Sequence, residues 1–274
     1  MFHPALRNLR FLRLILSHVG SYIQHPSSNL YLQHMVSFSL KDKSAKTLLF
    51  IVVIYLLCKL YFVISPADFP IESQKMVFSW GMIAGILVAG FLGYLCTQKV
   101  GYAGIWQDNI SNFQRFVLPA LLGLVYGIIT IAPHILHHDD SQHPLIRNNF
   151  AHVPFPGSIP FYVFGAIFME IFLKLVCIGI LSWLISSLLL RGKYTEITFW
   201  VINILVAFYE PMPYIQQSIE AGKSPFIAIT SEMFGALYIS NLISGYIGKR
   251  FGFLASLIMR LAHYIVWHIL FPLF

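Results

Sequence analysis

Four charged side chains interrupt long apolar segments of this chain, where they could act on a water molecule or a peptide bond. Glu170 and Lys174 are the only formal charges in the segment 159–190, and Glu210 and Arg260 lie in two later apolar segments. Because a charge inside hydrocarbon costs about 3 kcal/mol, such side chains pair, face a protein interior or do chemistry. A carboxylate beside a water can act as a general base, and an arginine can stabilise an oxyanion.

The same four residues also fit a purely structural role. Their charges sum to zero, and Glu170 and Lys174 have the i,i+4 spacing, glutamate first, that favours pairing on a helix. Arg260 carries five donors on a long side chain and so suits a bridge to a carboxylate. Two interpretations therefore stay open: a neutral ion-pair network that joins three helices, or an intramembrane site around a water-filled cavity.

The elements that carry these residues are predicted to be membrane-spanning helices. The 274-residue chain is 57% hydrophobic and 11% charged, against about 25% charged residues in soluble domains. A span needs about 20 apolar residues, and this predicts an all-α, multi-pass transmembrane helix bundle of about seven spans. The predicted spans are 47–65, 76–97, 116–136, 159–190, 197–213, 224–247 and 251–273.

Two of these spans have an unusual length. The segment 159–190 is too long for one upright helix at about 1.5 Å per residue, so it must tilt, protrude or break. The segment 197–213 is short for a span, and Pro211 and Pro213 should end its helix early.

The N-terminal part, residues 1–46, is predicted to lie outside the bundle of residues 47–274. Residues 5–19 place leucines on one helical face and Arg7, Arg10 and Arg13 on another. This pattern indicates an amphipathic helix on the cytoplasmic leaflet or, alternatively, a soluble cap on the bundle. Residues 24–46 are polar and are predicted to be a connector.

The distribution of basic residues predicts a cytoplasmic N-terminus. With seven spans in that orientation, the outside segments hold only Lys75, Arg147 and Lys223. The inside segments hold most of these lysines and arginines, as the positive-inside rule expects. These residues are Arg7, Arg10, Arg13, Lys41, Lys43, Lys46, Lys99, Arg115, Arg191, Lys193, Lys249 and Arg250. Topology thus accounts for the net charge of +7, and no nucleic-acid partner is predicted.

Small and sulfur-containing residues within the spans are predicted to serve packing. Gly81 and Gly85 form a GxxxG pair that is followed by Ala89 and Gly93, and small residues at that spacing let helices approach closely. Gly123 and Gly127 repeat the pattern in the next span. The three cysteines, Cys58, Cys96 and Cys177, lie inside apolar spans and are expected to be reduced packing residues.

A histidine- and aspartate-rich stretch occupies residues 134–152. Such residues could bind a transition metal, but their spacing fits no defined site, and a solvated outer loop is the prediction. The sequence therefore assigns no metal site and no cofactor, and it assigns no oligomeric state.

Several segments resemble the CPBP family of type II CAAX prenyl proteases and Abi-like bacteriocin-processing proteins. The string FMEIFLKLVCIGILSWL at 168–184 resembles the family's first motif, EExxxR inside a long apolar helix. Residues 197–213 resemble the second motif helix, FxxxH, and residues 250–273 contain a stretch that resembles the last. Residues 101–136 resemble the GL…W segment and the span that follows it, so the resemblance extends over most of the chain.

The first two motifs are degenerate here. Met169 and Glu170 stand at the paired glutamates of the first motif, and Lys174 stands at its arginine. In the second motif Val206 replaces the phenylalanine and Glu210 replaces the histidine.

The last motif can be aligned in two registers. The preferred register places Arg260 at the motif histidine, Tyr264 at the following Asn or Asp, and His268 at a histidine that often follows. The competing register places His263 at the motif histidine and Trp267 at its partner.

The resemblance implies a peptide-bond hydrolase in which a glutamate and a histidine activate a water. With these substitutions, catalysis would fall to Glu170 and Glu210, with Arg260 opposing the raised pKa that a carboxylate pair would otherwise have. The predicted function is a CPBP-like membrane protein with impaired or lost peptidase activity. The alternatives are a non-catalytic protein that binds a membrane protein or peptide, and a proton-coupled transporter. The expected partners are the lipid bilayer and a membrane-protein or peptide ligand.

Overall fold

The computed structural model describes residues 42–65, 76–136, 153, 155–220, 222–230 and 232–271. Over these residues the chain is helical and contains no strand, which confirms the predicted all-α class. The predicted N-terminal amphipathic helix and most of the histidine-rich loop lie outside the described residues. So does the predicted connector up to residue 41, but its last residues, 43–46, are helical and begin the first described helix.

Five helices are long and apolar enough to cross a membrane. This is the composition of an integral membrane protein. The first two are α2 (Lys43–Ile64) and α4 (Trp80–Lys99). The third joins η1 (Phe113–Val117) to α5 (Leu118–Leu136). The fourth joins α7 (Ser158–Glu170), η2 (Ile171–Ile180) and η3 (Trp183–Leu189). The fifth joins α12 (Phe253–Tyr264) to η4 (Ile265–Leu270).

The remaining two predicted spans are divided into shorter helices. In place of 197–213 there is α8 (Thr195–Ala207), and α9 (Met212–Glu220) follows after a turn. The helix thus ends before Pro211, as predicted, because proline cannot donate the hydrogen bond that would continue it. In place of 224–247 there are α10 (Pro225–Thr230) and α11 (Glu232–Phe251).

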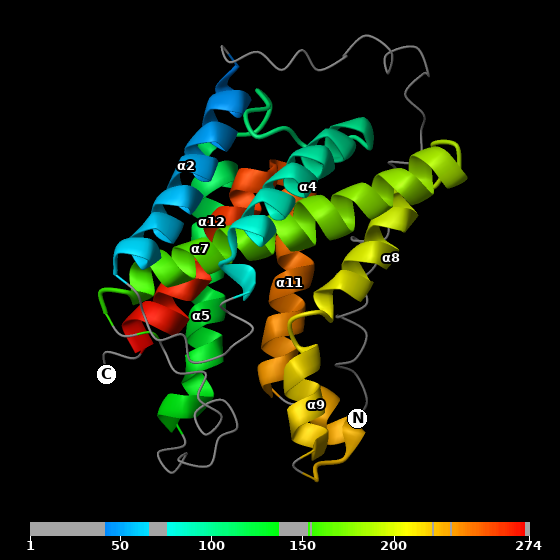
Figure 1. The fold of residues 1–274 in the computed structure, drawn as a ribbon. Helices are drawn as coiled ribbons and strands as arrows, with labels where there is room; N and C mark the ends of the chain where they lie inside the picture. Colours follow the sequence, from blue (N-terminus) through cyan, green and yellow to red (C-terminus); the bar gives the residue numbers. More distant parts are fainter. Residues whose placement is uncertain are drawn as a thin grey trace, which may run out of the picture. The chain divides into compact units, whose positions relative to one another are not determined.

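The long segment Ser158–Leu189 runs for 32 residues without a break. In its second half the helix adopts π-type hydrogen bonding, i to i+5, which widens each turn. Figure 1 shows α7 and its continuation lying obliquely across α5 and α11. Of the three predicted outcomes, breaking is excluded, and the oblique course agrees with tilting.

Glycines set the closest helix contacts, although not all of the predicted ones do. A Cβ added to Gly93 would collide with the backbone of Leu175, so α4 and η2 touch backbone to backbone. A Cβ added to Gly123 would collide with the backbone of Met259, so α5 lies equally close to α12. A Cβ added to Gly81 or Gly85 would have no atom of a described residue within 4 Å, so the close approach predicted for this series is found at Gly93 and not at this pair.

Aromatic side chains fill the core between α2 and α7. The Phe164 ring stacks on Tyr55 with centroids 4.2 Å apart and on Phe78 with centroids 4.0 Å apart. All three cysteines are unpaired, as predicted. These contacts fix α7, which carries Glu170 at its end.

Candidate functional site

The guanidinium of Arg260 joins groups from several helices. Its Nε donates to Glu170 Oε1 at 2.6 Å, and its Nη1 donates to Glu210 Oε1 at 2.7 Å. Its Nη2 donates to Asn241 Oδ1 at 3.1 Å, and Tyr264 Oη lies 3.4 Å from Nη1. The predicted meeting of Glu170, Glu210 and Arg260 is therefore confirmed.

The two ion pairs differ in burial. The Glu170 side chain is fully buried and that of Arg260 is 6% exposed, whereas the Glu210 side chain is 17% exposed. Charge-assisted hydrogen bonds are strong in such surroundings, but a buried charge is costly once its partner is removed. The ion pair with the Arg260 guanidinium is thus the main interaction that offsets the cost of burying the Glu170 charge.

Glu170 has one further hydrogen bond and one unused oxygen. The hydroxyl of Ser244 on α11 donates to Oε1 at 3.3 Å. The other oxygen, Oε2, is buried and has no hydrogen-bond partner among the described residues. A carboxylate oxygen in that situation is open to a proton or a small donor.

Local backbone geometry places these side chains. Gly123 lets α12 approach α5 closely and sets the depth of Arg260. Gly245 lies against the amide of Asn203, which draws α11 to α8, and the Asn203 amide donates to Leu242 O at 3.0 Å. The turn between α8 and α9 then carries Glu210 to the guanidinium.

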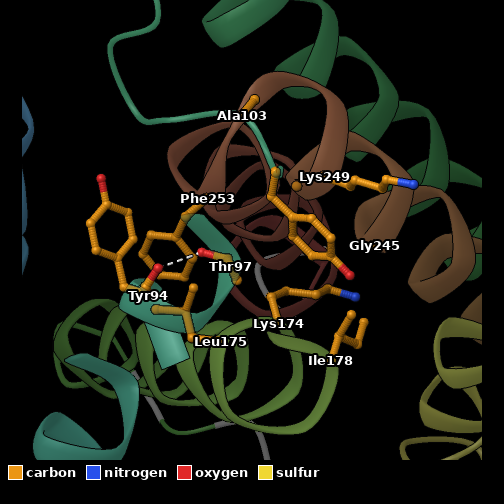
Figure 2. A pocket seen from close by; sticks show the side chains of 11 residues that line it. Tyr94, Thr97, Ala103, Lys174, Leu175, Ile178, Gly245, Lys249 and Phe253 are labelled. Carbon is orange, nitrogen blue, oxygen red and sulfur yellow. Dashed lines mark hydrogen bonds between the residues drawn. The ribbon is translucent and has the colours of Figure 1, made fainter. Parts of the chain in front are cut away.

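Lys174 does not join the ion pairs. Its ammonium donates to the backbone carbonyl of Asn241 at 3.1 Å, while Glu170 pairs with Arg260. The predicted Glu170–Lys174 ion pair is absent from the part of the chain that the structure describes. Lys174 instead lines a small cavity of about 20 Å³ together with Tyr102 and Lys249. Figure 2 shows its side chain reaching from η2 toward Gly245 on α11.

A larger cavity of about 520 Å³ adjoins the ion pairs. Glu210 and Arg260 lie on its wall, and Glu170 lies behind them. Most of the remaining wall is aromatic, amide, hydroxyl or methionine side chain. Its lining includes Thr130, Met169, Tyr209, Met212, Tyr214, Gln216, Ser240, Asn241, Ser244, His263, Tyr264, Trp267 and His268.

The residues of both possible registers of the last motif line this cavity, but only one set contacts the carboxylates. Arg260 holds both glutamates and also contacts Tyr264. His263 faces the other way, with Nε2 3.4 Å from the Thr130 hydroxyl. The His268 ring stacks on Tyr162 with centroids 3.9 Å apart. Arg260 and Tyr264 therefore lie beside the carboxylates.

The carboxylates do not fit a metal ion. The guanidinium already lies between Glu170 and Glu210, at the place that a bridging cation would occupy. Among the described residues, no three His, Cys, Asp or Glu side chains gather as a ligand set. No step of the chemistry is therefore assigned to a metal.

This arrangement is better suited to binding than to hydrolysis. A general base must be free to take a proton from water. Glu170 and Glu210 each accept a short hydrogen bond from Arg260, which stabilises the charged carboxylates. The cavity nevertheless offers a large, mostly apolar surface with a few polar groups on one wall.

Sequence reasoning overlooked the polar residues of α11. Ser240, Asn241 and Ser244 all line the large cavity, and two of them bond to the ion-pair network. Their i, i+1, i+4 spacing within an apolar stretch was the available signal.

Comparisons of the sequence with protein-family models and curated proteins, and of the fold with solved structures, found no match.

Proposed function

We propose that this chain is a CPBP-like integral membrane protein that binds a peptide or a membrane-protein segment and has lost peptidase activity. The observation that carries the proposal is the bridge from Arg260 to Glu170 and Glu210. In this proposal the positions of a glutamate-dependent peptidase persist, but an ion-pair network replaces the water-activating centre.

The positions of the motif residues support the family assignment. Glu170 ends α7, Glu210 follows α8 and Arg260 lies on α12, and the three meet although they are distant in sequence. The family resemblance and the tendency of charges in apolar segments to pair both call for this convergence.

The size and lining of the large cavity support binding. Pockets for small ligands measure about 300–1,000 Å³ and are mostly apolar, with a few polar groups that fix orientation. The cavity here is about 520 Å³, with aromatic residues such as Tyr214 and Trp267 and one charged wall. This volume accommodates a few side chains of a bound segment.

We also propose that the chain crosses the membrane seven times with its N-terminus in the cytoplasm. In this topology the segment 5–19 lies on the cytoplasmic leaflet. Single cysteines at Lys193 and Lys223, in a chain lacking its three native cysteines, test the orientation. An impermeant maleimide applied to right-side-out cells should label Lys223→Cys and leave Lys193→Cys unlabelled. The reverse labelling would contradict it.

Two assays on the purified full-length chain separate binding from hydrolysis. In the first, peptide libraries that include prenylated peptides are incubated with the chain and with Glu170→Gln. We expect no cleavage by either. Cleavage that is lost in Glu170→Gln would overturn the proposal in favour of an active peptidase.

The second assay is photo-crosslinking in native membranes. A photoreactive phenylalanine analogue replaces Tyr209, which lines the cavity and is 53% exposed, and as a control Val88, which is 63% exposed on α4. We expect a discrete protein or peptide adduct from position 209 and only lipid adducts from position 88. Identical adducts from both positions would show that the cavity is not the binding site.

A further inference from the structure

Glu210 presents one carboxylate oxygen to the large cavity. Its Oε1 accepts the hydrogen bond from Arg260 Nη1 at 2.7 Å, whereas its Oε2 accepts none from a described residue. The Asn241 side chain lies close enough to interact with Glu210, but its Nδ2 makes no hydrogen bond within the described part of the chain. Because the Glu210 side chain is 17% exposed and lines the cavity, Oε2 is open to a donor that enters there.

The guanidinium of Arg260 has no nitrogen left for an anionic ligand. Its Nε donates to Glu170, its Nη1 to Glu210 and its Nη2 to Asn241 Oδ1. A carboxylate or phosphate on a ligand would therefore approach two like charges, Glu170 and Glu210, and find the nearby cation already engaged. Unpaired like charges of this kind select against a ligand.

Lys174 does not offer a second cation to a ligand in the large cavity. Its ammonium donates to the backbone carbonyl of Asn241, and its side chain lines the small cavity. Among the described residues, the lining of the large cavity contains no lysine. A ligand in this cavity can therefore reach an open carboxylate oxygen but no cation that is free to pair with it.

Aromatic rings on the same wall favour a cation over a neutral donor. Tyr209 and Tyr264 both line the cavity, and Tyr209 directly precedes Glu210 in the chain. The face of an aromatic ring attracts a cation within about 6 Å. The protein already contains one such contact, because the guanidinium carbon of Arg260 lies 5.8 Å from the centre of the Tyr264 ring. A ligand cation beside Glu210 would repeat this pairing of a carboxylate with aromatic rings.

The single open oxygen favours a lysine over an arginine. A guanidinium binds a carboxylate best through parallel hydrogen bonds to both oxygens, and Arg260 already occupies Glu210 Oε1. An ammonium is a compact point charge that can pair with one oxygen. The long aliphatic stem of a lysine can also lie along apolar side chains while its ammonium reaches a polar group. The large cavity offers both surfaces.

A lysine side chain also fits this wall better than the amine of a lipid headgroup does. The ammonium of phosphatidylethanolamine is joined to a phosphate, which would bring a negative charge toward Glu170 and Glu210. A lysine side chain carries no anion. The charges around the cavity therefore favour a lysine of a peptide or protein.

We propose that the large cavity binds a lysine side chain of the bound segment, with the ammonium on Glu210 Oε2 and the stem beside Tyr209 and Tyr264. This inference rests on the proposed binding function and names the side chain that the cavity takes. A hydrogen bond to a charged group changes affinity by about ten- to a hundred-fold. The lysine therefore determines which segments bind.

Peptide binding to the purified full-length chain in detergent tests the inference. The probes are labelled apolar helical peptides of about 20 residues that differ only in one central residue, which is Lys, Arg, Met or Glu. Fluorescence anisotropy gives their dissociation constants. We expect the Lys peptide to bind at least about ten-fold more tightly than the Met peptide. The Arg peptide should fall between them, and the Glu peptide should bind most weakly.

The ratio of the Lys and Met affinities is then compared between variants, because a loss of folded protein leaves each dissociation constant unchanged. Glu210→Gln should reduce the preference for Lys to less than about two-fold. Glu196→Gln is the matched control, since Glu196 also pairs with a basic residue near one end of α8 but lines neither cavity. It should keep the full preference.

A second variant guards against a folding defect in Glu210→Gln. Tyr209→Leu removes an aromatic ring from the cavity wall and breaks no ion pair. We expect the preference for Lys to fall about two- to five-fold, as the loss of one cation–π contact predicts. An unchanged preference in this variant would contradict the proposed position of the lysine stem.

The remaining outcomes separate this inference from the proposed function. Equal binding of the Lys and Met peptides, or a preference that survives Glu210→Gln, would overturn the lysine site and leave peptide binding standing. Failure of every peptide to bind would overturn both. If added phosphatidylethanolamine abolished the preference for Lys, the site would take a lipid amine, and the peptide lysine would be wrong.

Discussion

Arg260 Nε lies 2.6 Å from Glu170 Oε1, although 90 positions separate the two residues in the sequence. The same guanidinium holds Glu210 at 2.7 Å, so one side chain ties α12 to the end of α7 and to the turn after α8. Both elements carry positions that resemble peptidase motifs. In the proposed function, this contact would hold the helices together in place of a catalytic centre.

The two carboxylates should contribute unequally to this network. Glu170 is fully buried, whereas Glu210 is 17% exposed on the wall of the large cavity. Water can partly compensate an unpaired Glu210 charge but not an unpaired Glu170 charge. In an Arg260→Ala background, we expect Glu170→Gln to restore more stability than Glu210→Gln. Chemical unfolding in detergent measures the difference, and equal restoration would contradict this ranking.

Removing Lys174 should cost less stability than removing Arg260. The Lys174 ammonium makes one hydrogen bond, to Asn241 O, whereas Arg260 contacts four side chains. Lys174→Met removes a hydrogen bond to a neutral carbonyl and breaks no ion pair, so we expect it to cost about 1–3 kcal/mol. Arg260→Met leaves two carboxylates unpaired, and we expect it to cost at least about 3–5 kcal/mol. If unfolding experiments showed a larger cost for Lys174→Met than for Arg260→Met, Lys174 and not Arg260 would be the more important cation for stability.

Gly93 and Gly85 on α4 form a matched pair for testing the helix contact. A methyl group at Gly93 would collide with the Leu175 backbone, which cannot move aside as a flexible side chain can. Gly85 has open space around it. We expect Gly93→Ala to destabilise the protein by about 1–3 kcal/mol, as overpacked cores do. Gly85→Ala should be neutral or slightly stabilising, because alanine favours the helix. Indistinguishable thermal unfolding of the two variants would refute the contact.

The Lys249–Glu196 pair should contribute little to stability. Glu196 is 65% exposed and is screened by solvent. Exposed pairs contribute about 0.2–1 kcal/mol, so Glu196→Gln should cost less than about 1 kcal/mol. The cost should shrink further in 1 M salt, where the Debye length is about 3 Å. An effect that is large and insensitive to salt would assign this pair a structural role.

The sequence predicted the helical membrane class because composition and span length determine it directly. Glu170, Glu210 and Arg260 could be predicted as one cluster because isolated charges in apolar segments must find each other. The early end of the helix before Pro211 followed from proline chemistry.

Other features depend on tertiary contacts that one sequence does not encode locally. Lys174 turned toward Asn241 because Arg260 already occupies Glu170, and i,i+4 spacing cannot reveal such competition. Glycine spacing predicted a close contact on this span but did not show which of Gly81, Gly85 and Gly93 makes it, and of these three it is Gly93. The polar residues of α11 carry no formal charge, and so they gave a weaker signal than the glutamates.

A double-mutant cycle between Glu170 and Arg260 tests most directly whether their ion pair stabilises the fold. Free energies of unfolding are measured in detergent for Arg260→Ala, Glu170→Gln and the double variant. We expect Arg260→Ala to cost about 3–5 kcal/mol, because it leaves the Glu170 charge buried and unpaired. The double variant should be more stable than Arg260→Ala alone, with a coupling of at least about 2 kcal/mol. If the costs of the two single substitutions add to that of the double variant within about 0.5 kcal/mol, the two residues do not stabilise each other. That result would contradict a stabilising ion pair between Glu170 and Arg260.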